Sequence, residues 1–123
     1  STQARVAKMQ GAFGAVKAGA ALYHAQWLVS GSPADGNTVS MEGKAIAGVN
    51  GYPAASATGI QEAAGLLATD YGLAAGTGTP ATFTITVDPN TTATRANCNV
   101  VYTAAPVGGA PTIVLNASEA NCK

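Results

Sequence analysis

The sequence contains few charged residues and no excess of either sign. Only 10% of its 123 residues are Asp, Glu, Lys or Arg, and six basic residues balance six acidic ones. A surface that binds nucleic acid needs clustered Lys and Arg to neutralise phosphates, so we expect no nucleic-acid partner for this domain. Apolar runs are also short, because none approaches the roughly 18–20 residues that span a bilayer.

Residue types suited to catalysis are scarce as well. His24 is the only histidine, and we expect it to be a partly exposed helix residue rather than part of a catalytic triad. The acidic residues are scattered singly, without a pair at helical spacing or a calcium-binding loop. Gly76-Thr77-Gly78 follows an expected helix and precedes an expected strand, which is the reverse of a phosphate-binding loop. The sequence therefore predicts a protein that is not an enzyme and has no catalytic residue, metal or cofactor.

Large apolar side chains are few. The chain has 27 Ala and 15 Gly residues, which leaves 25 Val, Ile, Leu, Met, Phe and Trp residues to fill a core. Its length suits one domain, 1–123, and small domains with thin cores are often cross-linked. A metal site would need more ligands than Cys98, Cys122 and a single histidine supply. We therefore predict a disulfide between Cys98 and Cys122, and with it an oxidising compartment.

The N-terminal part of the chain carries a strong helical pattern. Apolar side chains recur at alternating spacings of 3 and 4 residues and predict a helix over 1–30, which Gly31 and Pro33 end. This apolar stripe is predicted to pack against the domain's own sheet. It consists of Val6, Met9, Phe13, Val16, Ala20, Tyr23 and Trp27.

The remaining chain changes from turns to strands. A connecting segment, 31–80, is followed by an antiparallel sheet and disulfide loop, 81–123, so the expected fold class is α+β. In the connecting segment we predict a hairpin that pairs Val39 with Ile46, and then a turn at 50–53. A capping box at Thr58 and Gln61 opens a short helix over 58–69, and a loop over 72–80 follows. In the last part we predict strands at 82–87, 98–103 and Thr112–Asn116.

The side of the first helix opposite the apolar stripe is almost uncharged. It is predicted to consist of Lys8, Gly11, Ala15, Ala18, Leu22 and Gln26. A solvated helix surface usually carries several charges and few glycines, whereas small residues every three or four positions let another helix approach closely. We interpret these six residues as an assembly face. The alternative is that alanine is abundant here for its helix propensity alone, which leaves the glycines unexplained.

The order of these features resembles type IV pilins. The shared layout is a helix cut at its N-terminal side, an irregular connecting segment, an antiparallel sheet and a C-terminal disulfide loop. The helix through Tyr23-His24-Ala25-Gln26-Trp27 and the segment Asn50-Gly51-Tyr52-Pro53 are most similar to type IVa pilins of the mannose-sensitive haemagglutinin kind.

The resemblance implies a subunit surrounded by other copies of itself and by related pilins in a helical filament on the cell surface. It also implies an apolar N-terminal helix half, absent from this sequence, that is held in the inner membrane before assembly. Arg5 and Lys8 lie in the first two helical turns, although a helix N-terminus favours acidic residues. We therefore expect the chain to be a shortened form of such a subunit.

The function expected from these features is that of a structural subunit of a pilus-like filament, supporting attachment, motility or DNA uptake. One alternative is a carbohydrate- or surface-binding extracellular module that uses the surface formed by 77–94. Another is a pseudopilin of type II secretion, although no calcium site is found in the sequence. An enzyme remains possible only if His24 has a nucleophile beside it.

Overall fold

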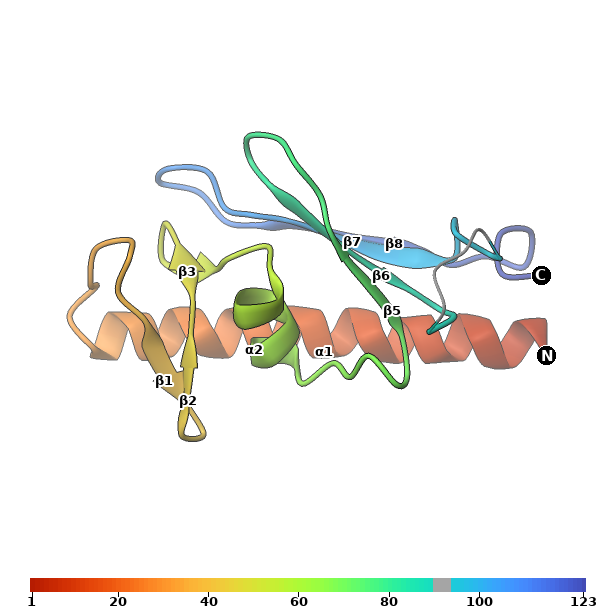
Figure 1. The fold of residues 1–123 in the computed structure, drawn as a ribbon, viewed down its shortest axis with the longest axis horizontal. Coiled ribbons are helices and arrows are strands. Elements are labelled where there is room, and N and C mark those ends of the chain that lie inside the picture. The colour runs from red at the N-terminus through yellow and green to blue at the C-terminus, as the bar shows by residue number, and fades with distance from the viewer. Residues whose placement is uncertain (90–93) are drawn as a thin grey trace.

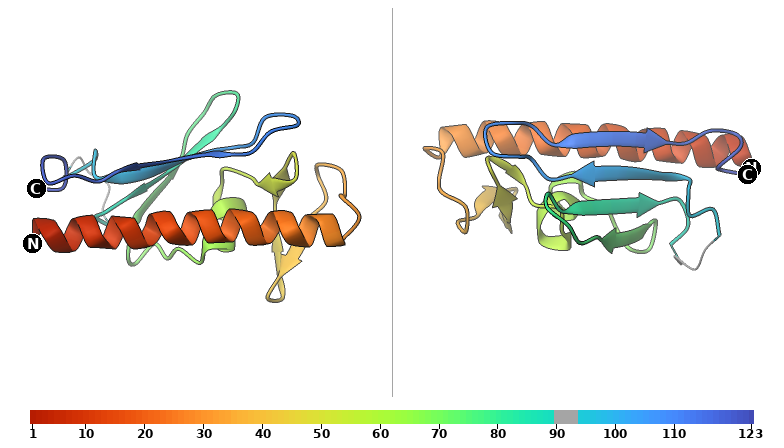
Figure 2. Two further views of the ribbon diagram at one scale, coloured as in Figure 1. Left: turned by 180° about the vertical axis from the view of Figure 1, so that it is seen from behind. Right: turned by 90° about the horizontal axis from the view of Figure 1, so that it is seen from above.

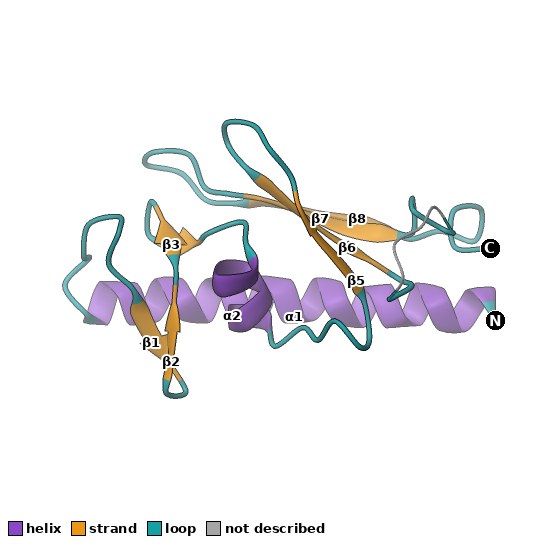
Figure 3. Ribbon diagram, in the orientation of Figure 1, coloured by secondary structure: helices purple, strands orange, loops and turns teal. Residues whose placement is uncertain are grey.

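The computed structural model describes residues 1–89 and 94–123. A long N-terminal helix, α1 (Thr2–Val29), runs the full length of the molecule, and a four-stranded antiparallel sheet lies across its first half (Figures 1 and 2). Two small hairpins and a short helix cover its second half (Figure 3). The predicted α+β fold, with a long helix packed on an antiparallel sheet and a C-terminal disulfide, is confirmed.

Helix α1 begins and ends at local signals in the sequence. The Ser1 hydroxyl accepts a hydrogen bond from the Ala4 amide at 3.1 Å, which satisfies one of the free N–H groups of the first turn. At the other end Gly31 has a φ of +86°, a left-handed conformation that stops the helix. The 28 residues between these signals make a rod of about 42 Å.

One side of α1 is buried against the sheet. Of the predicted inward stripe, Met9, Val16, Ala20 and Tyr23 are buried, and Val6, Phe13 and Trp27 are partly buried. Two small residues, Ala12 and Gly19, are buried as well. Met9, Ala12, Val16 and Ala20 share a core with apolar side chains of the sheet, which include Phe83, Ile85, Val100 and Tyr102. Tyr23 and Trp27 pack in a separate core near the end of the helix.

The sheet has the order β5 (Gly72–Ala75), β6 (Thr82–Thr86), β7 (Asn99–Thr103) and β8 (Thr112–Asn116). In β6, Phe83 and Ile85 are buried while Thr82 and Thr84 are partly exposed, which is the alternation of a half-buried strand. Thr86 at the end of the strand departs from this alternation, because it is buried as well. The loop predicted over 72–80 is wrong in its first part, since Gly72–Ala75 pairs with β6 as an edge strand. Gly and Ala are depleted in strands, so the residue types of this segment do not predict a strand. The segment pairs because β6 offers it free N–H and C=O groups along one edge.

The β1–β2 hairpin (Val39–Met41 and Lys44–Ile46) has the predicted register, with Val39 opposite Ile46. Its turn residues Glu42 and Gly43 both have positive φ, as a two-residue hairpin turn requires. Val39 and Ile46 form a second small core with Tyr23 of α1. The segment predicted as a simple turn at 50–53 belongs to another hairpin, β3 (Gly48–Val49) and β4 (Tyr52–Pro53).

The predicted short helix is wrong in its cap and its length. Its first turn is the wide turn Ala57–Gln61, which continues into α2 (Glu62–Ala64). The N-cap is Ser56, whose side chain makes no capping hydrogen bond to the backbone of this turn. Gly65 has a φ of +68° and ends the helix well before Thr69. In the chain that follows this helix end, Leu66 is buried, whereas Leu67 is 60% exposed.

The predicted disulfide is confirmed and lies near the start of α1. Cys98 and Cys122 are joined, and the Arg5 guanidinium donates a hydrogen bond from Nε to the Cys122 carbonyl at 2.6 Å. Both chain ends consequently lie at one end of the molecule (Figure 1). A cross-link over 24 residues stabilises the fold by about 3.5 kcal/mol if its effect is the entropy removed from the unfolded chain.

A buried tyrosine connects the sheet to the small hairpin β3–β4. The Tyr102 hydroxyl donates a hydrogen bond to the Pro53 carbonyl at 2.6 Å. Burial raises the pKa of Tyr102 well above its usual range, and the nearby Tyr23 and Tyr52 raise it further. Burial also raises the pKa of Tyr23, with Asp35 adding to the shift. These phenols are therefore held in their neutral form.

We predict that Tyr102 makes the protein sensitive to alkali. The unfolded phenol releases its proton near pH 10, before the folded one, so its stabilising effect is complete below about pH 10 and is lost as pH rises further. Burial also raises the pKa of Tyr71, with Asp70 adding to the shift. Urea unfolding of the wild type should show a fall in stability between pH 9 and 11, and Tyr102→Phe should show a smaller fall because the contributions of Tyr23 and Tyr71 remain. An equal fall in both proteins would contradict this assignment.

Candidate assembly surface

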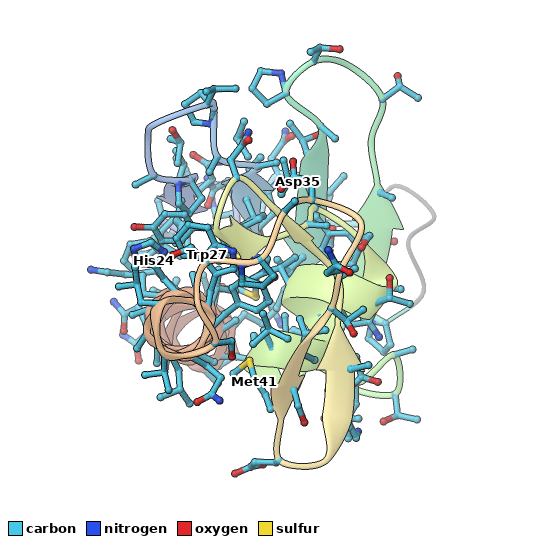
Figure 4. All side chains as sticks on the ribbon, turned by 90° about the vertical axis from the view of Figure 1, so that its left-hand side faces the viewer. His24, Trp27, Asp35 and Met41 are labelled. Atoms are coloured by element: carbon cyan, nitrogen blue, oxygen red, sulfur yellow. A yellow bond between two sulfur atoms is a disulfide. The ribbon has the colours of Figure 1, made fainter. Side chains whose placement is uncertain are left out.

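His24 joins α1 to the β3–β4 hairpin. Its Nδ1 lies 2.8 Å from the Gly51 carbonyl oxygen, which can only accept a hydrogen bond, so Nδ1 carries the proton. The imidazole stacks on Tyr52, with ring centres 4.1 Å apart, and on Trp27 at 5.4 Å. Figure 4 shows His24 and Trp27 together where α1 meets the rest of the domain. The contacts of His24 with described residues are thus structural contacts, and none of them is with a nucleophile.

Aromatic side chains are absent from the exposed part of the surface named above for carbohydrate binding. Within its described residues, 77–89 and Thr94, Phe83 is the one aromatic residue and is buried. Residues 90–93 of that surface lie outside the described residues. Across the two described ranges, no three His, Cys, Asp or Glu side chains lie close enough together to hold a metal ion.

The six predicted residues of the assembly face do not share one environment. Gly11, Ala18, Leu22 and Gln26 are exposed, and Leu22 is 62% exposed. Ala15 is partly buried. Lys8 is partly buried too, because its Nζ donates hydrogen bonds to the carbonyls of Val87, at 2.8 Å, and Asp70. These two residues therefore lie at the border of the domain's own packing surface.

The fully exposed side of α1 is rotated from the predicted face and is more regular. Eight exposed residues recur at spacings of 3, 4, 3, 4, 3, 4 and 3 along the whole helix, and seven of them are Ala or Gly. We call this set the small-residue seam. It consists of Ala4, Ala7, Gly11, Gly14, Ala18, Ala21, Ala25 and Leu28. The spacing is the heptad spacing of helices that pack along their length.

The seam is also uncharged. The one charged residue on the exposed part of α1 is Lys17, which lies beside the seam and places its Nζ 5.0 Å from the centre of the Phe13 ring. Viewed along its axis in Figure 4, α1 lies at the margin of the molecule, and the domain covers one side of the helix. The seam is therefore an apolar, narrow surface without a partner in the described part of this chain.

The glycines of α1 separate its two sides. Gly19 is buried, and a Cβ atom at this position would lie 2.6 Å from the carbonyl oxygen of Ala63, so only glycine allows α2 to approach this closely. A Cβ atom at Gly11 or Gly14 would have no atom within 4 Å. Each glycine in a helix interior costs roughly 0.5–1 kcal/mol relative to alanine. The fold of the single chain explains Gly19 but not Gly11 or Gly14.

Comparison of the chain with protein-family models, with curated proteins and with solved structures gives no match. Among the described residues, no helix combines the length and the apolar character needed to cross a membrane. The candidate assembly surface is therefore identified from the geometry of α1 alone.

The two kinds of glycine predict opposite effects of the same substitution. Gly14→Ala should stabilise the protein by about 0.5–1 kcal/mol, because alanine favours the helix and meets no atom. Gly19→Ala should destabilise it by about 1–3 kcal/mol, because the backbone of α2 has to move. Urea unfolding of both variants checks this. If the two substitutions changed stability in the same direction, the assignment of inner and outer sides would be incorrect.

Proposed function

We propose that the protein is a structural subunit of a type IV pilus-like surface filament. The observation that carries the proposal is the small-residue seam. It is a row of uncharged residues, nearly all Ala or Gly, that recur at heptad spacing on the outer side of a long helix. Each subunit uses the opposite side of α1 for its own core. The seam is then free for contact with the corresponding helices of other copies.

The chemistry of the seam supports contact between helices in particular. Alanine and glycine have no long side chains to order, and they let helix axes approach to about 8 Å, the short end of the usual range. A 3–4 spacing keeps the contact surfaces in register over many turns. Gly11 and Gly14 acquire a function in this arrangement, because the neighbouring backbone would fill the space that is open in the single chain.

The rest of the domain suits the outer layer of such a filament. The sheet packs on the buried side of α1, whereas the seam residues are exposed, so strands, loops and the disulfide would face outward when seams meet. Figure 2 shows the sheet on one side of the helix. Helices arranged around one axis contact one neighbour with one edge of the seam and the next neighbour with its other edge. This contact is between different surfaces, so it produces an open helical assembly when successive subunits are displaced along the axis. Attachment or motility would follow from the filament, and the proposal places the protein outside the cell.

Charge placed in the seam should prevent assembly without unfolding the domain. In cells that express the complete gene, Ala18→Arg should reduce the number of filaments at least tenfold, because a long charged side chain keeps neighbouring helices apart. The count is made by electron microscopy. Thr77→Arg is the matched control, since Thr77 is exposed in the loop after β5, and it should leave the count unchanged.

Stability of the two variants separates assembly from folding. Both substitutions are at exposed positions, so the urea midpoint of each purified domain should lie close to that of the wild type. Filaments that form normally with Ala18→Arg would rule out the seam as the assembly surface.

A further inference from the structure

An apolar cavity lies where three loops meet, away from the small-residue seam. Its volume is about 530 Å³, which is within the range of cavities that hold small molecules. The walls come from the β3–β4 hairpin and the residues after it, from the loop between β5 and β6, and from the loop between β7 and β8. The two longer loops project above the sheet in Figure 1.

The walls of this cavity contain no ionisable side chain. They are formed mainly by small apolar residues, with Asn50 and Thr79 as the polar side chains. Four other hollows on the described part of the chain each include a charged residue or His24 in their walls. An ion entering the apolar cavity would lose its hydration without meeting an opposite charge. The wall therefore favours a neutral ligand.

Asn50 gives the cavity one fixed polar group. Its backbone amide donates to Asp35 Oδ1 at 2.9 Å, and its side-chain Nδ2 donates to the Ala105 carbonyl at 2.9 Å. Both donors hold the residue in place, whereas Oδ1 accepts no hydrogen bond from any described residue. Asn50 lines this cavity and also the neighbouring hollow beside His24 and Trp27. Its acceptor is therefore within reach of a ligand that carries one hydrogen-bond donor.

The rim of the cavity is unusually apolar for an exposed loop. Val107 is 90% exposed, and its neighbours Pro106 and Pro80 are exposed as well. A bound ligand would cover part of this surface and remove it from water.

We propose that this cavity binds a small, neutral, largely apolar molecule that donates one hydrogen bond to Asn50 Oδ1. The ligand is of the size of two or three rings. This site is independent of filament assembly, because none of the cavity residues belongs to the seam.

A pair of fluorescent probes tests the proposal. N-phenyl-1-naphthylamine is neutral, apolar and has one N–H donor, and 8-anilinonaphthalene-1-sulfonate is the same skeleton with a negative charge. The neutral probe should bind to the folded protein with one-to-one stoichiometry and increased emission. The anionic probe should bind at least tenfold more weakly. No binding of the neutral probe, or equal binding of both, would overturn the proposal.

Substitutions identify the surface to which the neutral probe binds. Val107→Asp adds a charge to the rim and should weaken binding of the neutral probe at least tenfold. Val29→Asp is the matched control, because Val29 is 81% exposed at the end of α1 and is not part of the cavity. Ala81→Phe, which fills the cavity from its wall, should also reduce binding. A larger loss with Val29→Asp than with Val107→Asp would show that the probe binds α1 and would refute the site.

Discussion

The structure depends on the packing of one side of α1 against everything else in the domain. The sheet meets the first half of the helix through Met9 and Val16, and the hairpin β1–β2 meets its second half through Tyr23. Between them Gly19 lets α2 approach to the distance of direct backbone contact. Since the core has few large side chains, this single helix supplies much of the surface that the other elements need to cover.

Specific polar contacts fix the helix at both ends. Arg5 connects its first turns to the disulfide, and Lys8 bonds to carbonyls beside the sheet. At the other end His24 and Trp27 donate to, or pack on, the loops that follow. These contacts use the charged and aromatic residues of α1 on its inner side and borders. Alanine and glycine are left to form most of the exposed seam, which glutamines and Lys17 flank, and this seam is the basis of the proposed assembly.

The sequence predicts elements with strong local signals and misses those set by their neighbours. The helix 1–30, the pairing of Val39 with Ile46 and the strand Thr112–Asn116 follow from periodicity and turn residues. Strand Gly72–Ala75 does not, because its pairing depends on the exposed edge of β6. The sequence predicts the exposed side of α1 only in part, because Lys8 and Ala15 are partly buried. Counting large apolar residues ignores that Ala12 and Gly19 are also buried, and this rotates the exposed seam toward Gly14, Ala21 and Ala25.

The central claim is that the small-residue seam contacts the same helix in neighbouring copies. Its most direct test is oxidative cross-linking of the complete protein in filaments, with one added cysteine at Gly14 and, in a separate variant, at exposed Thr77. The account predicts covalent dimers for Gly14→Cys, because helices that meet along the seam bring equivalent turns within disulfide distance, and a single added thiol per subunit can join only two copies. Gly14→Cys that stays monomeric, while Thr77→Cys is cross-linked efficiently, would contradict the account.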